Sequence, residues 1–257
     1  MIPKIIHYCW FGGNPLPELA LKCIESWKKY CPDYEIIEWN ESNFDIDALQ
    51  YTKEAYEAKK YAFVADVARL KALYEFGGIY MDTDMELLKN IDDLNNCDFY
   101  LGFERNTKVA FGICGAIKHS PIIHKLLLYY RDTHFDIKKM TTIVDNITDI
   151  FEDMGLKLNG KTQKIVNSVI YSIDYFYPKS VETNKINFTN NTCAIHHYEG
   201  SWLNDIQRFK KEKKFYYIDK FGKTFGKFAY LMHRFFYVLK TDGIGKTLLL
   251  VRKKIGF

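Results

Sequence analysis

Apolar and polar positions follow two different periods along this chain. The apolar run 2–9 predicts a buried strand, apolar residues at helical spacing after Pro17 predict a helix, and the run 34–39 predicts a second strand. A strand, a helix and a strand in this order are typical of an α/β sheet. The pattern therefore favours an α/β fold from the start of the chain.

The clearest helix is expected at residues 61–76, where the apolar side chains form one stripe. Gly77 and Gly78 follow it, in the position of a left-handed C-cap. A short apolar strand, 79–81, then runs directly into Asp82-Thr83-Asp84. Further strands are expected at residues 98–103, 109–116 and 192–198, and further helices at residues 121–131 and 142–151.

The pattern changes after Arg208. Apolar residues between 225 and 239 fall on one helical face and Lys and Arg lie mostly elsewhere, which predicts a basic amphipathic helix. A second such helix is expected at residues 243–254. We therefore expect a globular domain over residues 1–207 and a basic, aromatic helical tail over residues 208–257.

The net charge of +4 conceals an uneven distribution. Residues 208–257 contain 14 Lys and Arg against 3 Asp and Glu, whereas residues 1–207 contain 22 against 29. A basic tail can be a membrane-surface anchor, a nucleic-acid patch, or a solvated helix face that contacts another copy. Apolar residues flanked by Lys and Arg suit an anionic leaflet better than a groove in DNA, so we expect an anionic membrane surface as partner and no nucleic acid.

Composition excludes several classes of protein. With 47% hydrophobic and 26% charged residues over 257 positions, the chain is neither collagen-like nor disordered. Its six cysteines form no CxxC pair and are expected to be reduced core thiols of a cytosolic protein. Lys4 and His7 interrupt the first apolar run, so no signal peptide is expected, and the longest apolar runs are too short to span a bilayer.

The most informative chemistry is the pair of carboxylates Asp82 and Asp84. Two positions apart in extended chain, they point the same way. Mg²⁺ and Mn²⁺ prefer such oxygen ligands and complete their shells with phosphate oxygens. On its own the pair could equally be an acidic turn exposed to water.

Three segments together resemble glycosyltransferase family 32, the DXD-containing sugar transferases. They are residues 65–84 (ADVARLKALYEFGGIYMDTD), 2–10 (IPKIIHYCW) and 194–202 (AIHHYEGSW). The resemblance covers residues 1 to about 202 and leaves the basic tail outside. It implies a GT-A fold, which is a nucleotide-sugar-binding, Rossmann-like mixed sheet flanked by helices, followed here by the basic helical extension.

The resemblance also implies a metal centre. Asp82 and Asp84 would bind Mn²⁺ or Mg²⁺, and a histidine of the third segment would add a nitrogen ligand. His196 and His197 face opposite sides of a strand, so only one should reach the metal. We expect His196, and His197 is the alternative.

Asp66 and Arg69 lie at i and i+3 on one face of the predicted helix. Within the family, Asp66 would accept hydrogen bonds from sugar hydroxyls and Arg69 would touch the sugar or the diphosphate. We therefore expect Asp66 and Arg69 to be catalytic together with Asp82 and Asp84. A simple ion pair is the alternative.

Further residues are expected to contact the nucleotide sugar around this group. Tyr8 and Trp10 end the first strand, where an aromatic ring could stack on the base of the nucleotide or belong to the core. The others are expected from Tyr80, Thr83, Ser201 and Trp202, with the last two near the β-phosphate. Glu104 and Asp98 are candidates for acceptor contacts on position alone, and Gly112–Ala116 for backbone close to the sugar.

The resemblance implies a retaining, metal-dependent hexosyltransferase of capsular or surface polysaccharide synthesis. We expect UDP-galactose or UDP-glucose as donor, a lipid-linked oligosaccharide as acceptor, and a cytoplasmic location, peripheral on the inner face of the membrane. The alternatives are a GDP-mannose-dependent mannosyltransferase, a toxin-like enzyme that glycosylates proteins, and a carbohydrate-binding scaffold without activity. The oligomeric state is left open.

Overall fold

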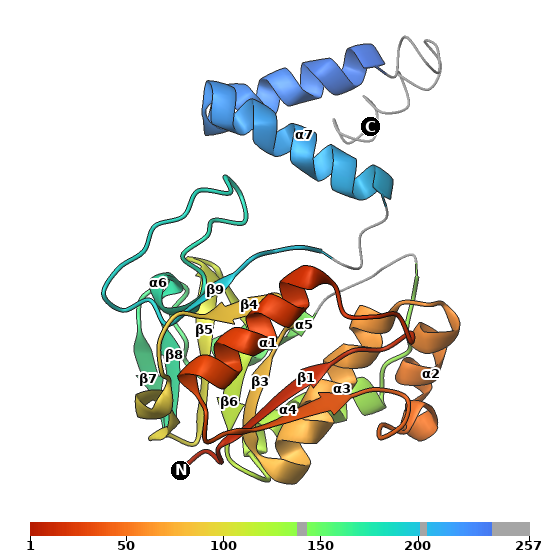
Figure 1. Ribbon diagram of the computed structural model, residues 1–257, viewed down its shortest axis with the longest axis vertical. Helices are drawn as coiled ribbons and strands as arrows, with labels where there is room; N and C mark the ends of the chain where they lie inside the picture. Colours follow the sequence, from red (N-terminus) through yellow and green to blue (C-terminus); the bar gives the residue numbers. More distant parts are fainter. Residues whose placement is uncertain (138–142, 201–204, 238–257) are drawn as a thin grey trace. The chain divides into compact units, whose positions relative to one another are not determined.

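The computed structural model describes residues 1–137, 143–200 and 205–237. It divides into two compact units (Figure 1). The first unit consists of Met1–Ser180 and Ile186–Trp202, and the second of Val181–Lys185 and Leu203–Phe257.

A seven-stranded mixed sheet forms the centre of the first unit. Its order is β2-β1-β3-β6-β5-β8-β7, with β1 parallel to β2 and β3, β6 antiparallel to β3 and β5, β5 parallel to β8, and β7 antiparallel to β8. The mixed α/β fold expected from the sequence is thereby confirmed. The strands are β1 (Ile5–Cys9), β2 (Glu35–Trp39), β3 (Gly78–Met81), β5 (Phe99–Arg105), β6 (Lys108–Ala116), β7 (Gln163–Ile165) and β8 (Ser168–Tyr171).

Helices cover both faces of this sheet, and alternate residues of each strand enter opposite cores. Phe99, Leu101 and Phe103 of β5 join one core, whereas Tyr100 joins the other. The core that contains Phe99 also takes residues of α2 (Gln50–Glu57), α3 (Tyr61–Phe76), α4 (Pro121–Arg131) and α5 (Ile143–Asp153). The core that contains Tyr100 takes residues of α1 (Glu18–Tyr30) and α6 (Ile173–Phe176).

The helix α3 begins and ends where its sequence pattern predicts. Gly77 ends it with φ of +69°, a left-handed value that favours glycine. A Cβ on Gly78 would lie 2.6 Å from the Ile5 carbonyl oxygen, so glycine also permits β3 to approach β1. The buried His7 ring strengthens this junction, since its Nε2 lies 2.8 Å from the Gly77 carbonyl oxygen and its Nδ1 accepts the Trp39 indole N–H.

A separate two-stranded ladder pairs β4 (Met85–Leu87) with β9 (Ala194–His196) in antiparallel register. Two side chains of α1 hold β4 in place: the Trp27 indole donates to the Met85 carbonyl at 2.7 Å, and the Ser26 hydroxyl accepts the Leu87 N–H at 2.9 Å. The sequence did not predict β4. It also did not predict β7, β8, α2, α6 or the short 3₁₀ helices Ile46–Ala48 and Asp92–Asn95.

The described part of the second unit contains a helical hairpin, formed by α7 (Asp205–Phe221) and the helix at residues 223–237. We call these residues, 205–237, the basic hairpin. Gly222 makes the turn with φ of +76°, and a Cβ on Gly226 would lie 2.4 Å from the Ile218 Cα, so glycine lets the two helices touch. The helix expected near 225–239 is present over its described residues, α7 was not predicted, and the helix expected at 243–254 lies outside the described residues.

Among the described residues, no helix combines the length and apolar character needed to cross a membrane. The six cysteines are free thiols, and five of them are buried.

Candidate active site

The candidate site lies where the main sheet passes into the β4–β9 ladder. The strands β1 and β3 are parallel, with His7 opposite Tyr80, so their carboxyl ends share one edge of the sheet. In open α/β sheets this edge is where ligands bind. Asp82 follows β3 directly: its N–H donates to the Gly112 carbonyl at 2.8 Å, and its own carbonyl accepts the Met85 N–H at 2.9 Å. This tight turn carries Asp82 and Asp84 to the junction between the two sheets.

Asp82, Asp84 and His196 form one group. One ligand atom from each residue lies within 4.8 Å of the other two, and Nε2 of His196 is 3.0 Å from Oδ1 of Asp84. The Glu199 N–H donates to Oδ2 of Asp84 at 2.9 Å and fixes the orientation of the carboxylate. Two carboxylates and one imidazole are a donor set that suits Mn²⁺ or Mg²⁺. The residues present therefore fit the divalent metal that the DXD motif implies.

His197 points away from this group. Its Nε2 lies 2.8 Å from Oε2 of Glu86, which also pairs with Lys22 at 3.0 Å. The backbone N–H of His197 donates to the Asp84 carbonyl at 3.0 Å. The strand alternation that left two candidates in the sequence thus places His196, and not His197, beside the carboxylates.

The electrostatics of Asp84 and His196 favour an ion pair. Burial by itself would raise the pKa of Asp84, but His196 and the Glu199 amide outweigh it and bring that pKa to about 2. Burial would likewise lower the pKa of His196, and Asp84 raises it above the ordinary value. The interaction with His196 therefore keeps Asp84 ionised although the site is half-buried.

Arg69 connects α3 to the same edge of the sheet. Its side chain is buried and lies 3.1 Å from Oδ1 of Asp66 and 3.3 Å from Oδ1 of Asp82. It also donates to the Phe111 carbonyl at 3.2 Å and stacks 4.4 Å above the centroid of the Tyr80 ring. One guanidinium thus holds two carboxylates from different elements, as expected for a planar, multidentate cation.

Burial affects the two carboxylates that share Arg69. Burial raises the pKa of Asp66 to about 6, and the neighbouring Asp82 adds to the rise, although Arg69 opposes both. Burial also raises the pKa of Asp82 against the opposing effect of Arg69. Arg69 is therefore the group that keeps both carboxylates available as anions.

Three further residues surround the group. A Cβ on Gly112 would lie 3.3 Å from Oδ2 of Asp82 and 3.2 Å from the Tyr177 hydroxyl, so any side chain there would crowd the site. The half-buried Lys179 donates to the His197 carbonyl at 2.7 Å, and Asp84 acts on it electrostatically. Tyr177 and Lys179 could not be predicted from the sequence, because they lie in an irregular segment between α6 and β9 that carries no periodic signal.

The aromatic and acceptor candidates divide between two ends of the sheet. Tyr8 is buried and its hydroxyl donates to Glu38 at 2.6 Å, while the half-buried Trp10 donates its indole N–H to the Asn14 carbonyl. Glu104, near the end of β5, interacts electrostatically with His196. Asp98 precedes β5 and lies at the opposite end of the sheet, so its assignment as an acceptor contact is wrong.

Of the other residues expected to contact the nucleotide sugar, two lie in or beside the site and two lie outside the described residues. Tyr80 is buried and donates its hydroxyl to Oδ1 of Asp82 at 2.8 Å, and Thr83 is half-buried in the turn. Ser201 and Trp202 lie outside the described residues. Their expected role near the β-phosphate stays a prediction.

Comparisons with known proteins point to sugar transfer. Residues 17–100 match the family model described as a glycosyltransferase sugar-binding region containing a DXD motif. Asp66, Arg69, Asp82 and Asp84 lie within the match, and His196 lies beyond it. Inositol phosphoceramide mannosyltransferase 3 of Schizosaccharomyces pombe is 30% identical over 126 residues, which cover 48% of this chain and 35% of that protein.

Two other similarities cover more of the chain. A glycosyltransferase of Acanthamoeba polyphaga mimivirus, described as uncharacterized, is 28% identical over 226 residues, or 82% of this chain and 87% of that protein. The solved structure of PaToxG Glycosyltransferase has a TM-score of 0.48 and 20% sequence identity over 60% of this chain and 70% of that chain. The match to this chain spans only 35–38% of the length of the first three curated relatives. Their names describe them as transferring mannose or making mannosyl lipids.

Proposed function

We propose that this chain is a glycosyltransferase that transfers a hexose from a nucleotide sugar to a lipid-linked acceptor, with retention of anomeric configuration. The observation that carries the proposal is the Asp82–Asp84–His196 group at the carboxyl edge of β1 and β3, with the Asp66–Arg69 pair packed against Asp82. The match of residues 17–100 to the DXD sugar-binding region supports the same assignment.

Each residue of the group has a role that its environment supports. Asp82, Asp84 and His196 would hold Mn²⁺ or Mg²⁺, which supplies positive charge to the departing nucleoside diphosphate. Arg69 favours the ionised form of the half-buried Asp82 and fixes the direction of its carboxylate. Asp66, on the same helix face, can accept hydrogen bonds from sugar hydroxyls.

Lys179 would supply a second positive charge to the leaving group. Its ammonium makes no ion pair with a carboxylate among the residues that the structure describes, and its hydrogen bond goes to the neutral His197 carbonyl. A cation held in this way can turn to a phosphate oxygen without giving up an ion pair. Lys22, by contrast, is already paired with Glu86.

Two donors remain in competition. UDP-galactose or UDP-glucose follows from the resemblance to capsular transferases. A mannose donor, GDP-mannose, is favoured by the names of the relatives, several of which are inositol phosphoceramide mannosyltransferases. The same names favour a lipid acceptor, which agrees with our proposal of a cytoplasmic enzyme that works at the inner face of the membrane.

The test is hydrolysis and transfer by the full chain with a panel of nucleotide sugars, with and without Mn²⁺. We expect one donor to be consumed only when metal is present, and label to enter the organic phase when a lipid acceptor is supplied. Label in a protein substrate would favour the toxin-like alternative. If no donor is bound or consumed under any metal, the transferase proposal is wrong.

The two adjacent histidines provide a matched control. His196→Gln should lose Mn²⁺ binding, measured by titration calorimetry, together with donor hydrolysis. His197→Gln removes the same ring one position away and should retain both. Equal metal affinity in the two variants would contradict the assignment of His196 as a ligand.

A further inference from the structure

Large apolar side chains are exposed along one face of the second helix of the basic hairpin. Phe225 is 75% exposed, Phe228 62% and Phe236 57%, and Met232 lies between them on the same face at helical spacing. The packing between the two helices uses a different side, where Gly226 meets Ile218 and His233 lies against Tyr217. The exposed face is therefore not needed to form the hairpin.

The first helix, α7, carries a mixed face of rings and lysines. The ammonium of Lys213 lies 5.4 Å from the centroid of the Phe209 ring, and that of Lys220 lies 5.8 Å from the Tyr216 ring. Phe209 and Tyr216 are both more than half exposed. Rings with ammonium groups above them are suited to the boundary between lipid tails and charged headgroups, where the ring is buried and the charge stays in the headgroup layer.

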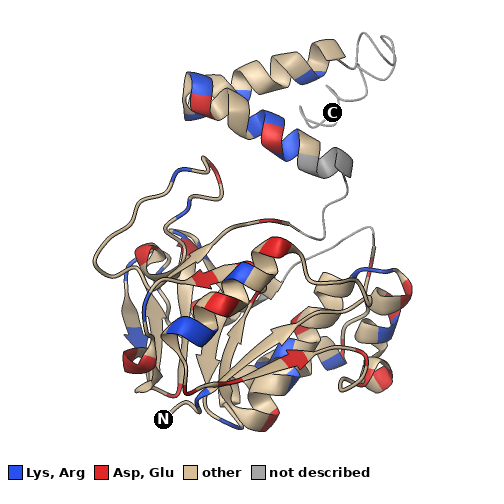
Figure 2. Ribbon diagram, viewed as in Figure 1, with Lys and Arg blue, Asp and Glu red and all other residues tan. Residues whose placement is uncertain are grey.

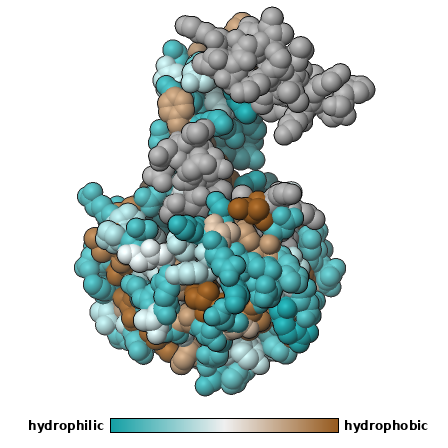
Figure 3. Space-filling view, turned by 90° about the vertical axis from the view of Figure 1, so that its right-hand side faces the viewer, coloured by the Kyte–Doolittle hydropathy of each residue, from teal (hydrophilic) through white to brown (hydrophobic). Residues whose placement is uncertain are grey.

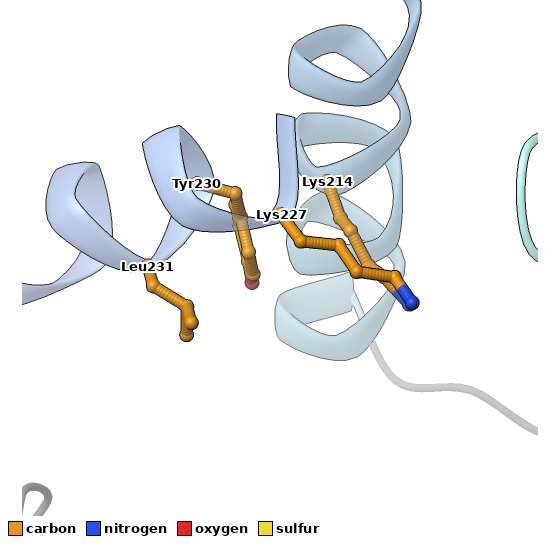
Figure 4. Close-up of a pocket in the computed structure, with 4 residues that line it drawn as sticks. All are labelled: Lys214, Lys227, Tyr230 and Leu231. Carbon is orange, nitrogen blue, oxygen red and sulfur yellow. The ribbon is translucent and has the colours of Figure 1, made fainter. Parts of the chain in front are cut away.

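A groove between the two helices adds a concentrated positive charge. Lys214 of α7 and Lys227 of the second helix line it together with Tyr230 and Leu231 (Figure 4). Figure 4 shows the two lysine side chains extending toward the same end of the groove. Among the described residues neither ammonium makes an ion pair with a carboxylate, so one anion at this end of the groove can bind both.

The charge balance of the hairpin favours the same kind of partner. Residues 205–237 contain nine Lys and Arg against three Asp and Glu, and Figure 2 shows the basic positions recurring along α7. On the first unit, the face drawn in Figure 3 has apolar residues only as separate patches among polar ones.

We propose that the basic hairpin binds the surface of an anionic lipid bilayer. The Phe225–Phe228–Phe236 face enters the headgroup boundary, the lysines of α7 remain among the headgroups, and the Lys214–Lys227 groove takes a lipid phosphate. A protein partner would need a matching acidic apolar surface, and nucleic acid would leave the phenylalanine face in water. Binding requires neither metal nor sugar donor, so it stands independently of the transferase proposal.

Flotation of the full chain with vesicles tests this. Vesicles of phosphatidylcholine with a third phosphatidylglycerol should carry the protein upward at low salt, and pure phosphatidylcholine vesicles should carry much less. Phe225→Ser, Phe228→Ser and Phe236→Ser combined should weaken partitioning about a hundredfold or more. Lys214→Gln with Lys227→Gln should weaken it about 25-fold, at about fivefold for each charge removed.

Matched controls come from the first unit. Ile137→Ser, Val166→Ser and Phe188→Ser replace three side chains that are likewise more than half exposed, and Lys125→Gln with Lys157→Gln removes two exposed lysines. Both controls should float like the unaltered chain. Helix content by circular dichroism, equal in all variants, shows that the hairpin remains folded.

Several results would overturn the proposal. One is flotation that does not depend on anionic lipid, and another is hairpin variants that bind as well as the controls. A third is a self-associating chain whose dimer disappears in the triple serine variant while vesicle binding is absent. Donor hydrolysis in lipid-free solution is measured on the same variants, so a failed membrane proposal is distinguished from a failed transferase proposal.

Discussion

The first unit and the basic hairpin use charged residues in opposite ways. In the first unit the decisive charges are buried or half-buried and committed to one another: Arg69 to Asp66 and Asp82, His196 to Asp84. In the hairpin most lysines are exposed, and Lys213 and Lys220 lie beside aromatic rings. Buried charges must be paired to be tolerated, and that pairing fixes geometry. Exposed charges cost little and can adapt, so the first arrangement suits a site and the second a surface.

The largest expected effect comes from removing a committed charge at the site. Asp84→Ala should abolish Mn²⁺ binding and reduce donor hydrolysis by about 10³-fold, because the charge stabilisation lost is about 4 kcal/mol. Initial rates at saturating donor measure it. Asp93→Ala, an exposed acid in the Asp92–Asn95 turn, is the control and should keep full activity. If the Asp84→Ala variant stays active, the paired charge of Asp84 is not needed for activity, and the contrast between paired charges in the first unit and exposed charges in the hairpin has no functional meaning.

Arg69→Met should cause the largest loss of stability. It leaves the buried Asp66 and the half-buried Asp82 without their shared cation, which costs about 3–5 kcal/mol and lowers Tm by about 10 °C. Calorimetry of the full chain measures this. Adding Asp66→Asn should recover part of the loss, since one of the two unpaired charges is then gone. No recovery would mean that packing, and not charge, explains the role of Arg69.

Gly226→Val should open the hairpin and leave the site intact. Its side chain would collide with the Ile218 backbone, at a cost of about 1–3 kcal/mol to the helix packing. Hydrogen exchange should show faster exchange in residues 205–237, and Mn²⁺ affinity should not change. A loss of metal binding in this variant would show that the two regions are not independent.

Lys179→Gln should have a moderate effect confined to turnover. We expect kcat to fall about tenfold while Mn²⁺ affinity is retained, because one of two cations near the leaving group is lost. Lys164→Gln, an exposed lysine of β7, is the control. An unchanged kcat would show that Lys179 does not act on the leaving group.

The smallest effect concerns pH and His7. Burial lowers the pKa of His7 below its ordinary 6.5, and the hydrogen bond to Gly77 only partly opposes this. The unfolded chain therefore binds a proton at His7 at a higher pH than the folded chain, so His7 reduces the unfolding free energy as pH falls below 6.5. Urea titrations at pH 7.5 and pH 5.5 should show this fall in the unaltered chain. The His7→Gln variant should have a lower unfolding free energy at both pH values, and that free energy should differ less between pH 7.5 and pH 5.5 than in the unaltered chain.

The sequence predicted the elements whose local signals were strong. The helix α3 was located to the residue because its apolar pattern ends at Gly77 and Gly78, although the helix is buried on nearly all sides and not along a single stripe. The strand β4 has three residues and no period to detect, and α7 lacks a continuous apolar stripe because lysines interrupt it. Local pattern was therefore sufficient for α3 and insufficient for β4 and α7.

The candidate site was predictable in its residue types and less so in its surroundings. The pairing of Asp66 with Arg69 followed from helix spacing, and the choice of His196 followed from strand alternation and the family resemblance. Lys179 and Tyr177 could not be found, since only tertiary folding brings their segment to Asp84. Asp98 was misplaced because chain position alone does not say at which end of an antiparallel strand a residue lies.

The β4–β9 ladder has a consequence for how the protein folds. It joins Asp84 to His196 across 112 positions, by three residue pairs that lie outside the main sheet. Closing a loop of that length has a large entropic cost that so few contacts repay poorly, so the ladder should form after the main sheet and α1 are in place. A divalent ion added during refolding should accordingly leave the early rate unchanged and accelerate only the last phase. The site would then be the final part of the first unit to become ordered and the first to open.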